Sequence, residues 1–286
     1  MKIASRVLLG LFFVFSAGAL AAEEAMPQVL VVIREFVKPG KSGAAHDRTE
    51  GAFAQAMARA KWPTHYVALS SMSGKPRSLF LTAYDSFDAW QKDEDAMDKN
   101  TALSDELDRL NAADSALLDS TDEGVFYYDK DSSYGQHEDL SFDRYMEIST
   151  YQVRPGHEAE WDQIVKMVTD AHKKAGTSAH WATYELSYGG SGNLYLILST
   201  DKSMAEIDQG FAEGKQFDAA MGEEGMKKFH ELIGSAIESS DSQLFSINPR
   251  QSYPPDAWVK AAPEFWKPKP MPSAAKPAAT DKKPAQ

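Results

Sequence analysis

The chain has 286 residues, with 30 basic and 42 acidic side chains, a formal net charge of −12 and no cysteine. The lack of cysteine excludes disulfides, thiolate nucleophiles and cysteine-ligated zinc or iron–sulfur centres. The acidic balance argues against binding to nucleic acid, and against attraction to an anionic membrane surface.

The first 22 residues have the pattern of a secretion signal. Lys2 and Arg6 form a basic start, residues 7–15 form an apolar core, and Ala19-Leu20-Ala21 forms a small-x-small cleavage site. The apolar core is too short to span a bilayer. We therefore expect a soluble protein that is periplasmic or secreted, with 28 basic and 42 acidic residues and no membrane contact after cleavage.

The first half of the folded body is expected over residues 28–130. A nearly continuous apolar strand at 29–37 ends at Lys38-Pro39-Gly40, as is typical of a strand covered on both faces. The rest of this half predicts a helix, a two-stranded hairpin, two more helices and a short strand, over 42–61, 65–71 with 78–84, 85–97, 101–118 and 125–128.

A linker at 131–142 leads to the second half at 143–253, which has the same order of elements. A strand at 145–153 ends at Arg154-Pro155-Gly156, and the apolar stripe of the next segment predicts a helix at 158–175. A hairpin, two helical segments and a last strand follow, at 180–187 with 193–200, 202–211, 214–238 and 243–247.

The two halves match residue by residue, which predicts a tandem duplication. His65-Tyr66 aligns with His180-Trp181 at an offset of 115, and Ser120-Thr121-Asp122 aligns with Ser239-Ser240-Asp241 at an offset of 119. Each copy then has the β-α-β-β-α-β order of a ferredoxin-like unit. A single such sheet leaves one face bare, so we expect an α+β protein in which two ferredoxin-like repeats pack sheet to sheet.

With these elements and the Pro-Gly break after each first strand, the chain resembles the dimeric α/β-barrel superfamily. The breaks and the small hairpin turns are similar to those of its NIPSNAP and antibiotic-biosynthesis-monooxygenase branches. The resemblance covers about residues 28–250. It implies a pseudo-dimeric α/β barrel around a central space, and activities that need no cofactor.

Residues 254–286 form a tail rich in proline, alanine and lysine. Nine of the 14 prolines lie between Pro249 and the C-terminus. Such a composition predicts disorder from about residue 268. Trp258, Phe265 and Trp266 interrupt the pattern, so we expect order as far as about residue 266.

No motif for phosphate binding, metal binding or nucleophilic catalysis is found. His46, His137, His157 and His230 do not differ from surface histidines, and we expect no metal and no cofactor. His65 and His180 differ, because they take equivalent places in the two halves. They are either general bases at the mouth of a cavity or structural residues that the duplication retained.

Strand parity suggests a set of side chains for the central space. Glu147 is a further candidate base there, because burial would raise its pKa. The expected ligand-binding residues are Glu35, Tyr66, Tyr84, Tyr151, Trp181 and Tyr195. The alternative is a filled core between the sheets, and an error of one residue in register would reverse the assignment.

Two functional hypotheses remain. The first is a non-catalytic exported protein that binds a small hydrophobic ligand or a partner in or near the central cavity, as a monomer or homodimer. The second, which the resemblance implies, is a cofactor-independent monooxygenase or isomerase that acts on a small aromatic or quinone-like substrate. His65, His180 and Glu147 are its candidate catalytic residues.

Overall fold

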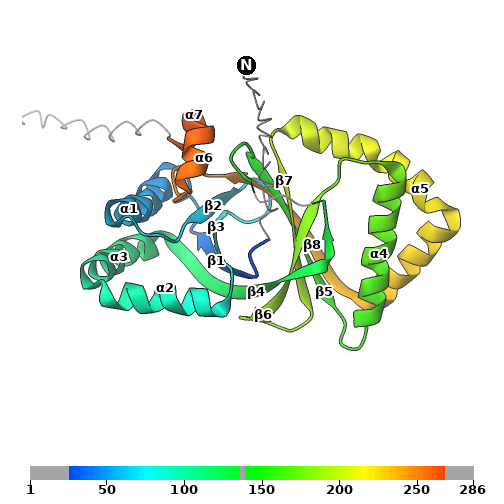
Figure 1. The fold of residues 1–286 in the computed structure, drawn as a ribbon, viewed down its shortest axis with the longest axis horizontal. Helices are drawn as coiled ribbons and strands as arrows, with labels where there is room; N and C mark the ends of the chain where they lie inside the picture. Colours follow the sequence, from blue (N-terminus) through cyan, green and yellow to red (C-terminus); the bar gives the residue numbers. More distant parts are fainter. Residues whose placement is uncertain (1–25, 136–138, 268–286) are drawn as a thin grey trace, which may run out of the picture.

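The fold is an eight-stranded closed antiparallel barrel with helices on its outside, as seen in a computed structural model (Figure 1). The structure describes residues 26–135 and 139–267. The strands follow one another around the barrel in the order β1-β3-β2-β8-β5-β7-β6-β4, and β4 pairs with β1 to close the ring. Helices α1, α2 and α3 cover one side of the barrel, and α4 and α5 cover the other (Figure 1).

The first half contributes four strands to the barrel. Its elements are β1 (Val29–Val37), α1 (Ala44–Ala60), β2 (Tyr66–Ser71), β3 (Arg77–Tyr84), α2 (Phe87–Lys99), α3 (Thr101–Asp114), a 3-10 turn (Ser115–Leu117) and β4 (Leu118–Tyr134). Ser86 begins α2 by accepting a hydrogen bond from the N–H of Ala89, and the side chain of Asn100 caps α3 in the same way. β4 is much longer than the strand expected at 125–128, and it takes in the start of the expected linker.

The second half contributes the other four strands. Its elements are β5 (Tyr145–Val153), α4 (Glu158–Ala175), β6 (Trp181–Tyr188), β7 (Leu194–Asp201), α5 (Met204–Ala236) and β8 (Ile237–Ile247). Gly176 ends α4 in the left-handed conformation. The helical segments expected at 202–211 and 214–238 join into α5, which is interrupted by non-helical backbone at Gly222 (φ 76°).

The two sets of strands meet at their edges. Within the halves the orders are β4-β1-β3-β2 and β8-β5-β7-β6, and the seams are β2 with β8 and β4 with β6. The two sets of strands therefore form one closed barrel, and their inner faces meet across its interior. Edge pairing occurs because it satisfies the backbone groups of all four edge strands and leaves the barrel without an open edge.

The barrel interior is filled mainly by aliphatic side chains. All eight strands contribute, with Phe126, Tyr128 and Phe245 among the larger residues; the aliphatic part includes Leu30, Val32, Val67, Leu69, Leu79, Leu81, Met146, Ile148, Leu186, Leu196 and Ile247. The other face of the strands packs under the helices. There Trp161 of α4 stacks on Tyr195 of β7, with 4.5 Å between ring centroids.

Two short helices follow the barrel, α6 (Asp256–Ala261) and α7 (Pro263–Trp266). Trp266 is buried against the barrel core, and its indole N–H donates to the carbonyl oxygen of Ser141 at 3.0 Å. The signal predicted at 1–22 and the disorder predicted from about residue 268 lie outside the described residues. None of the described helices is both long and apolar enough to cross a membrane.

Candidate functional site

A cavity of about 1590 Å³ opens at one end of the barrel. Its wall is formed by the ends of the strands and by three segments outside the strands. These segments are Met26–Gln28, the turn at Asp139–Ser141, and α6. Most lining side chains are apolar or aromatic, including Leu30, Val67, Leu81, Met146, Tyr128, Tyr184, Trp181 and Trp258. This composition is typical of a pocket for an apolar small molecule.

His65 lies in the wall of this cavity, immediately before β2. Its ring packs on Tyr253 with 4.6 Å between centroids. Burial lowers the pKa of His65, so the imidazole is neutral at physiological pH. Its Nδ1 is buried without a hydrogen-bond partner among the described residues.

His180 also lines the cavity, immediately before β6. Both of its ring nitrogens are close to backbone carbonyl oxygens. Nε2 lies 2.9 Å from the carbonyl oxygen of Thr200, and Nδ1 lies 3.2 Å from that of Ser178. These contacts join the start of β6 to the end of β7. The two equivalent histidines thus lie at the same cavity but differ in their surroundings.

The other expected site residues divide into two groups. Tyr66, Tyr84 and Trp181 line the cavity. Glu35, Glu147, Tyr151 and Tyr195 are on the outer face of the strands and do not line it. The expected parity is therefore reversed, because Leu30, Met146 and Leu196, from the alternate positions, face inward. Tyr66, Tyr84 and Trp181 have the outer parity as well, and they line the cavity because they are the end residues of their strands.

The reversed parity has a physical reason. Helices cover the outer face, so that face is apolar and aromatic too: Tyr151 and Tyr195 pack on Trp161 of α4, and Tyr84 stacks on Trp90 of α2. With both faces of a strand apolar, alternation along the sequence does not distinguish them. Glu147 is exposed, and Glu35 points to α1.

A second group of chemically active side chains lies under α1 and α3. Nε2 of His46 is 3.0 Å from a carboxylate oxygen of Glu35, 3.6 Å from one of Asp114 and 4.0 Å from one of Glu50. His46, Glu50 and Asp114 are 2%, 5% and 1% exposed. His46 is thus a buried residue, although its sequence context is that of a surface histidine.

The carboxylates dominate the electrostatics of this group. Burial alone would lower the pKa of His46, but its hydrogen bonds to Asp114 and Glu35 raise it to about 10. Burial and the charges of Glu35 and Asp114 raise the pKa of Glu50 to about 9. The pKa of Asp114 is lowered by His46 and Thr49, against the effect of burial.

Solved structures share this architecture. A candidate monooxygenase from Fusobacterium nucleatum superimposes with a TM-score of 0.51 and 13% sequence identity, over 78% of this chain and 93% of its own. The chain shares the α/β fold of this protein, built on a closed barrel. Identity this low shows the fold and not the activity. No protein-family model and no curated protein matches the sequence.

Two further α/β barrels of this type superimpose less closely. A heme-binding protein from Thermus thermophilus has a TM-score of 0.46 and 10% identity, over 82% of this chain and 96% of its own. A mutant chlorite dismutase from Candidatus Nitrospira defluvii has a TM-score of 0.47 and 8% identity, over 83% of this chain and 97% of its own.

Sequence reasoning located part of the cavity of this α/β barrel but missed the His46 group. Glu35 comes from β1, His46 and Glu50 come from α1, and Asp114 ends α3. Only His46 and Glu50 are close in sequence, four residues apart on one face of α1. That pair was the single local signal of the group, and it is common on helices that bind nothing.

Proposed function

We propose that the protein binds a small apolar ligand in the cavity at the open end of the barrel. The observation that carries this proposal is the cavity itself, about 1590 Å³ in volume with mainly apolar and aromatic walls. Water finds few hydrogen-bond partners on such walls, whereas an apolar ligand gains free energy when its surface is removed from solvent there. The volume is sufficient for a ligand with several rings or a long chain.

The polar side chains of the wall suggest how the ligand is oriented. Gln28, Asp85, Lys130 and Thr64 lie in the wall among the apolar residues. A few polar groups in an apolar pocket usually position one end of a ligand. We therefore expect an amphipathic molecule, with an apolar body among the tyrosines and one polar group.

A cavity-filling substitution tests this proposal. Ala83 lines the cavity from β3 and is exposed to it, so Ala83→Trp should occupy the space without disturbing the core. Binding of the apolar probe N-phenyl-1-naphthylamine, measured by fluorescence titration, should weaken about 10-fold or more. Ala205→Trp, on the exposed face of α5, is the matched control and should bind as the original protein does. Equal affinity in both variants would contradict the proposal.

The geometry of His65 favours a second candidate function, a cofactor-independent monooxygenase or isomerase acting on an aromatic or quinone-like molecule in the same cavity. A neutral imidazole in an apolar wall can accept a proton from a phenolic or activated C–H group. His65→Gln keeps the size of the side chain and removes the base. Turnover of a dihydroxynaphthalene, followed as oxygen uptake or absorbance change, should fall about 10²–10⁴-fold. Unchanged turnover would exclude His65 as the base, whereas no turnover by the original protein would favour ligand binding alone.

We also infer that the chain is an exported tandem repeat related to the NIPSNAP or antibiotic-biosynthesis-monooxygenase branch. The two halves have the same order of strands, and the matched Pro-Gly breaks follow β1 and β5, which supports two ferredoxin-like copies. One chain closes its own barrel, so a monomer is sufficient and a homodimer is the alternative. Mass spectrometry of the exported protein tests cleavage near Ala22, and light scattering distinguishes the two oligomeric states.

A further inference from the structure

We propose that Glu35, His46, Glu50 and Asp114 form a site for one divalent transition-metal ion, separate from the barrel cavity. One imidazole nitrogen and three carboxylate oxygens, one from each residue, lie within 4.8 Å of one another. Distances of 3.0, 3.6 and 4.0 Å join the imidazole Nε2 to the three carboxylates. Neighbouring ligands around a metal at about 2.0–2.2 Å are about 3–3.5 Å apart, so small side-chain rotations would complete the site.

Unpartnered buried oxygens point to an ion at this place. Oε1 of Glu50 and Oδ2 of Asp114 are both buried and accept no hydrogen bond from another group among residues 26–135 and 139–267. The two carboxyl groups are close enough to share a proton with each other. Both side chains are more than nine-tenths buried. A buried carboxylate oxygen without a partner is costly, and carboxylates in protein interiors are normally paired or bound to metal.

Positive charge is scarce around these oxygens. In the described part of the chain, the ion pairs of Glu50 and Asp114 are with His46, which Glu35 shares as well. In the metal-free group, where Glu50 retains its proton, one imidazolium faces two carboxylates. An ion that displaces the protons of Glu50 and His46 would face three carboxylates. A divalent cation would balance two of the three charges and would satisfy the free oxygens at the same time.

Outer contacts hold the imidazole in place, and the hydroxyl of Ser78 can accept the Nδ1–H that remains when Nε2 binds a metal. Nδ1 of His46 lies 3.4 Å from the hydroxyl of Ser78 and 3.4 Å from the amide nitrogen of Gln251. Gln251 is itself fixed, because it accepts from Ser78 and donates to Asp47, each at 3.0 Å. Nε2 is therefore directed to the carboxylates, as in metal sites whose histidines are oriented by a second set of contacts.

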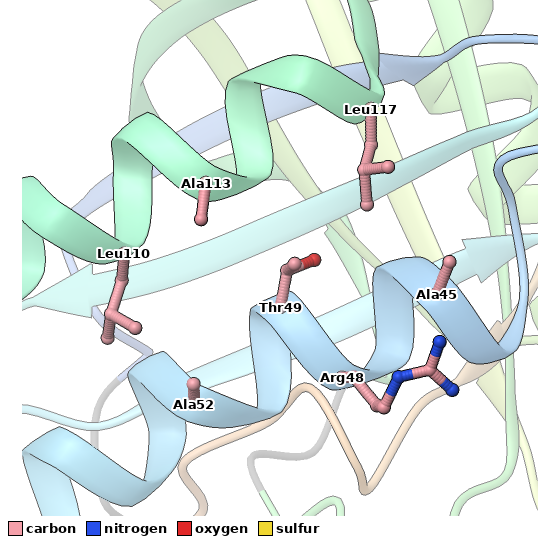
Figure 2. A pocket seen from close by; sticks show the side chains of 7 residues that line it. All are labelled: Ala45, Arg48, Thr49, Ala52, Leu110, Ala113 and Leu117. Carbon is pink, nitrogen blue, oxygen red and sulfur yellow. The ribbon is translucent and has the colours of Figure 1, made fainter. Parts of the chain in front are cut away.

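A hollow between α1 and α3 lies beside the group. Its volume is about 350 Å³, and it is lined by Ala45, Arg48, Thr49, Ala52, Leu110, Ala113 and Leu117. Figure 2 shows Thr49 and Ala52 of α1 facing Leu110 and Ala113 of α3 across this hollow. The hydroxyl of Thr49 donates to Asp114, so the floor of the hollow adjoins the proposed ligands.

The donor set selects the class of ion. Ca²⁺ and Mg²⁺ prefer oxygen ligands alone, whereas Cu⁺ prefers sulfur. One imidazole with three carboxylates suits Mn²⁺, Fe²⁺ or Zn²⁺. The metal-free alternative is a group that retains protons, with Glu50 protonated and donating to Asp114.

The test uses the full chain, stripped with a chelator and then titrated with Mn²⁺ or Zn²⁺ by calorimetry. We expect one ion per chain. Glu35→Gln and Asp114→Asn keep the shape of the side chains and should each weaken binding about 10-fold or more. Asp105→Asn, at an exposed carboxylate of α3, is the matched control and should leave binding unchanged.

Spectroscopy distinguishes residues that bind the ion from residues that only stabilise the fold. Electron-spin-echo spectra of bound Mn²⁺ should show coupling to one imidazole nitrogen, because His46 is the only nitrogen donor of the group. Circular dichroism and binding of the cavity probe should be retained in both variants, which separates failure of this site from failure of the cavity proposal. Absence of ion binding to the original protein, or equal binding by all variants, would overturn the metal site in favour of the protonated group.

Discussion

Two histidines of this chain lie in opposite electrostatic surroundings. His46 is buried among three carboxylates, and they raise its pKa to about 10. His65 is half-buried beside Tyr253 in the cavity wall, and burial lowers its pKa. At neutral pH the metal-free protein therefore carries a charged imidazole under α1 and a neutral one at the cavity. Neighbours, rather than residue type, determine which chemistry each ring can perform.

Asp201, at the end of β7, makes a testable contribution to the pH dependence of stability. Burial and then the charge of Glu147 raise its pKa to about 6, from an ordinary value of 3.8. The pKa of Asp201 is higher in the folded than in the unfolded protein. Ionisation of Asp201 therefore lowers the free energy of unfolding as the pH rises from about 4 to about 6. Asp201→Asn avoids this cost.

We expect Asp201→Asn to unfold at higher denaturant concentration than the original protein at pH 7, and to lose this advantage by pH 4. Solvent screening of this half-buried group keeps the gain below about 1 kcal/mol. Urea unfolding at a series of pH values measures it. Asp208→Asn, at an exposed position of α5, should show no such pH-dependent difference, and an equal profile for both variants would contradict the assignment to Asp201.

At the scale of elements, β4 and β8 are strands whose opening segments, after one apolar residue, are polar. Residues 118–124 read LDSTDEG and residues 237–242 read IESSDS, patterns that do not predict a strand. They become strands because they pair with β1 and β5, for example Asp122 opposite Arg34, with which it forms an ion pair. Pairing with a neighbouring strand stabilises the extended conformation here, because the β-propensity of these residues is too low to do so.

The pair α6–α7 is a terminal element whose docking depends on one side chain. Trp266 is 4% exposed, and Phe265 beside it packs under the guanidinium of Arg144 at 3.8 Å. Trp266→Ala should remove about 3–5 kcal/mol of packing. Because the element is terminal, we expect it to detach while the barrel remains folded.

Limited proteolysis followed by mass spectrometry checks this expectation. Trp266→Ala should be cut within residues 254–267 at a protease concentration that leaves the original protein intact, with little change in the main unfolding transition. Lys260→Ala, at an exposed position of α6, is the control and should resist cleavage. Equal resistance of both variants would show that Trp266 does not hold the element.

For the whole molecule, the barrel depends on two seams between the halves. The seam of β2 with β8 is short, since only Leu69, Ser70 and Ser71 pair across it. Two backbone bonds extend it, from the N–H of Met72 to the carbonyl of Leu244 at 2.9 Å and from Asn248 to Ala68 at 2.8 Å. This seam joins residues 68–72 to residues 244–248, so the barrel closes only when both ends of the chain are folded.

Met72→Pro tests this seam, because proline removes the N–H that bonds to Leu244. Met72 is 48% exposed, so Met72→Ala removes little packing and keeps the bond. We expect the proline variant to lose about 1–3 kcal/mol of free energy of unfolding relative to the alanine variant, measured by urea titration. Equal stability would mean that the bond across the seam contributes nothing.

The amino-acid sequence by itself determined the elements that have strong local patterns. The strands at 29–37 and 145–153 and the helix at 158–175 have the predicted bounds, because each has a continuous or periodic apolar pattern with a glycine-containing stop. The order of strands and helices, and through it the resemblance to α/β barrels, also follows from such local patterns. His65 and Trp181, near the strand ends, line the cavity, and their role there stays a prediction.

Only the tertiary structure decided which face of each strand is inside, how the two sheets close and which side chains meet. Both faces of the strands are apolar, so Tyr151 and Tyr195 could have faced either way until the helices covered one side. Glu35, His46 and Asp114 are brought together by the packing of β1, α1 and α3, over as many as 79 residues of chain. Local propensity acts over a few residues, whereas contacts of this kind depend on the complete fold, and the proposed metal site is therefore a property of the folded barrel.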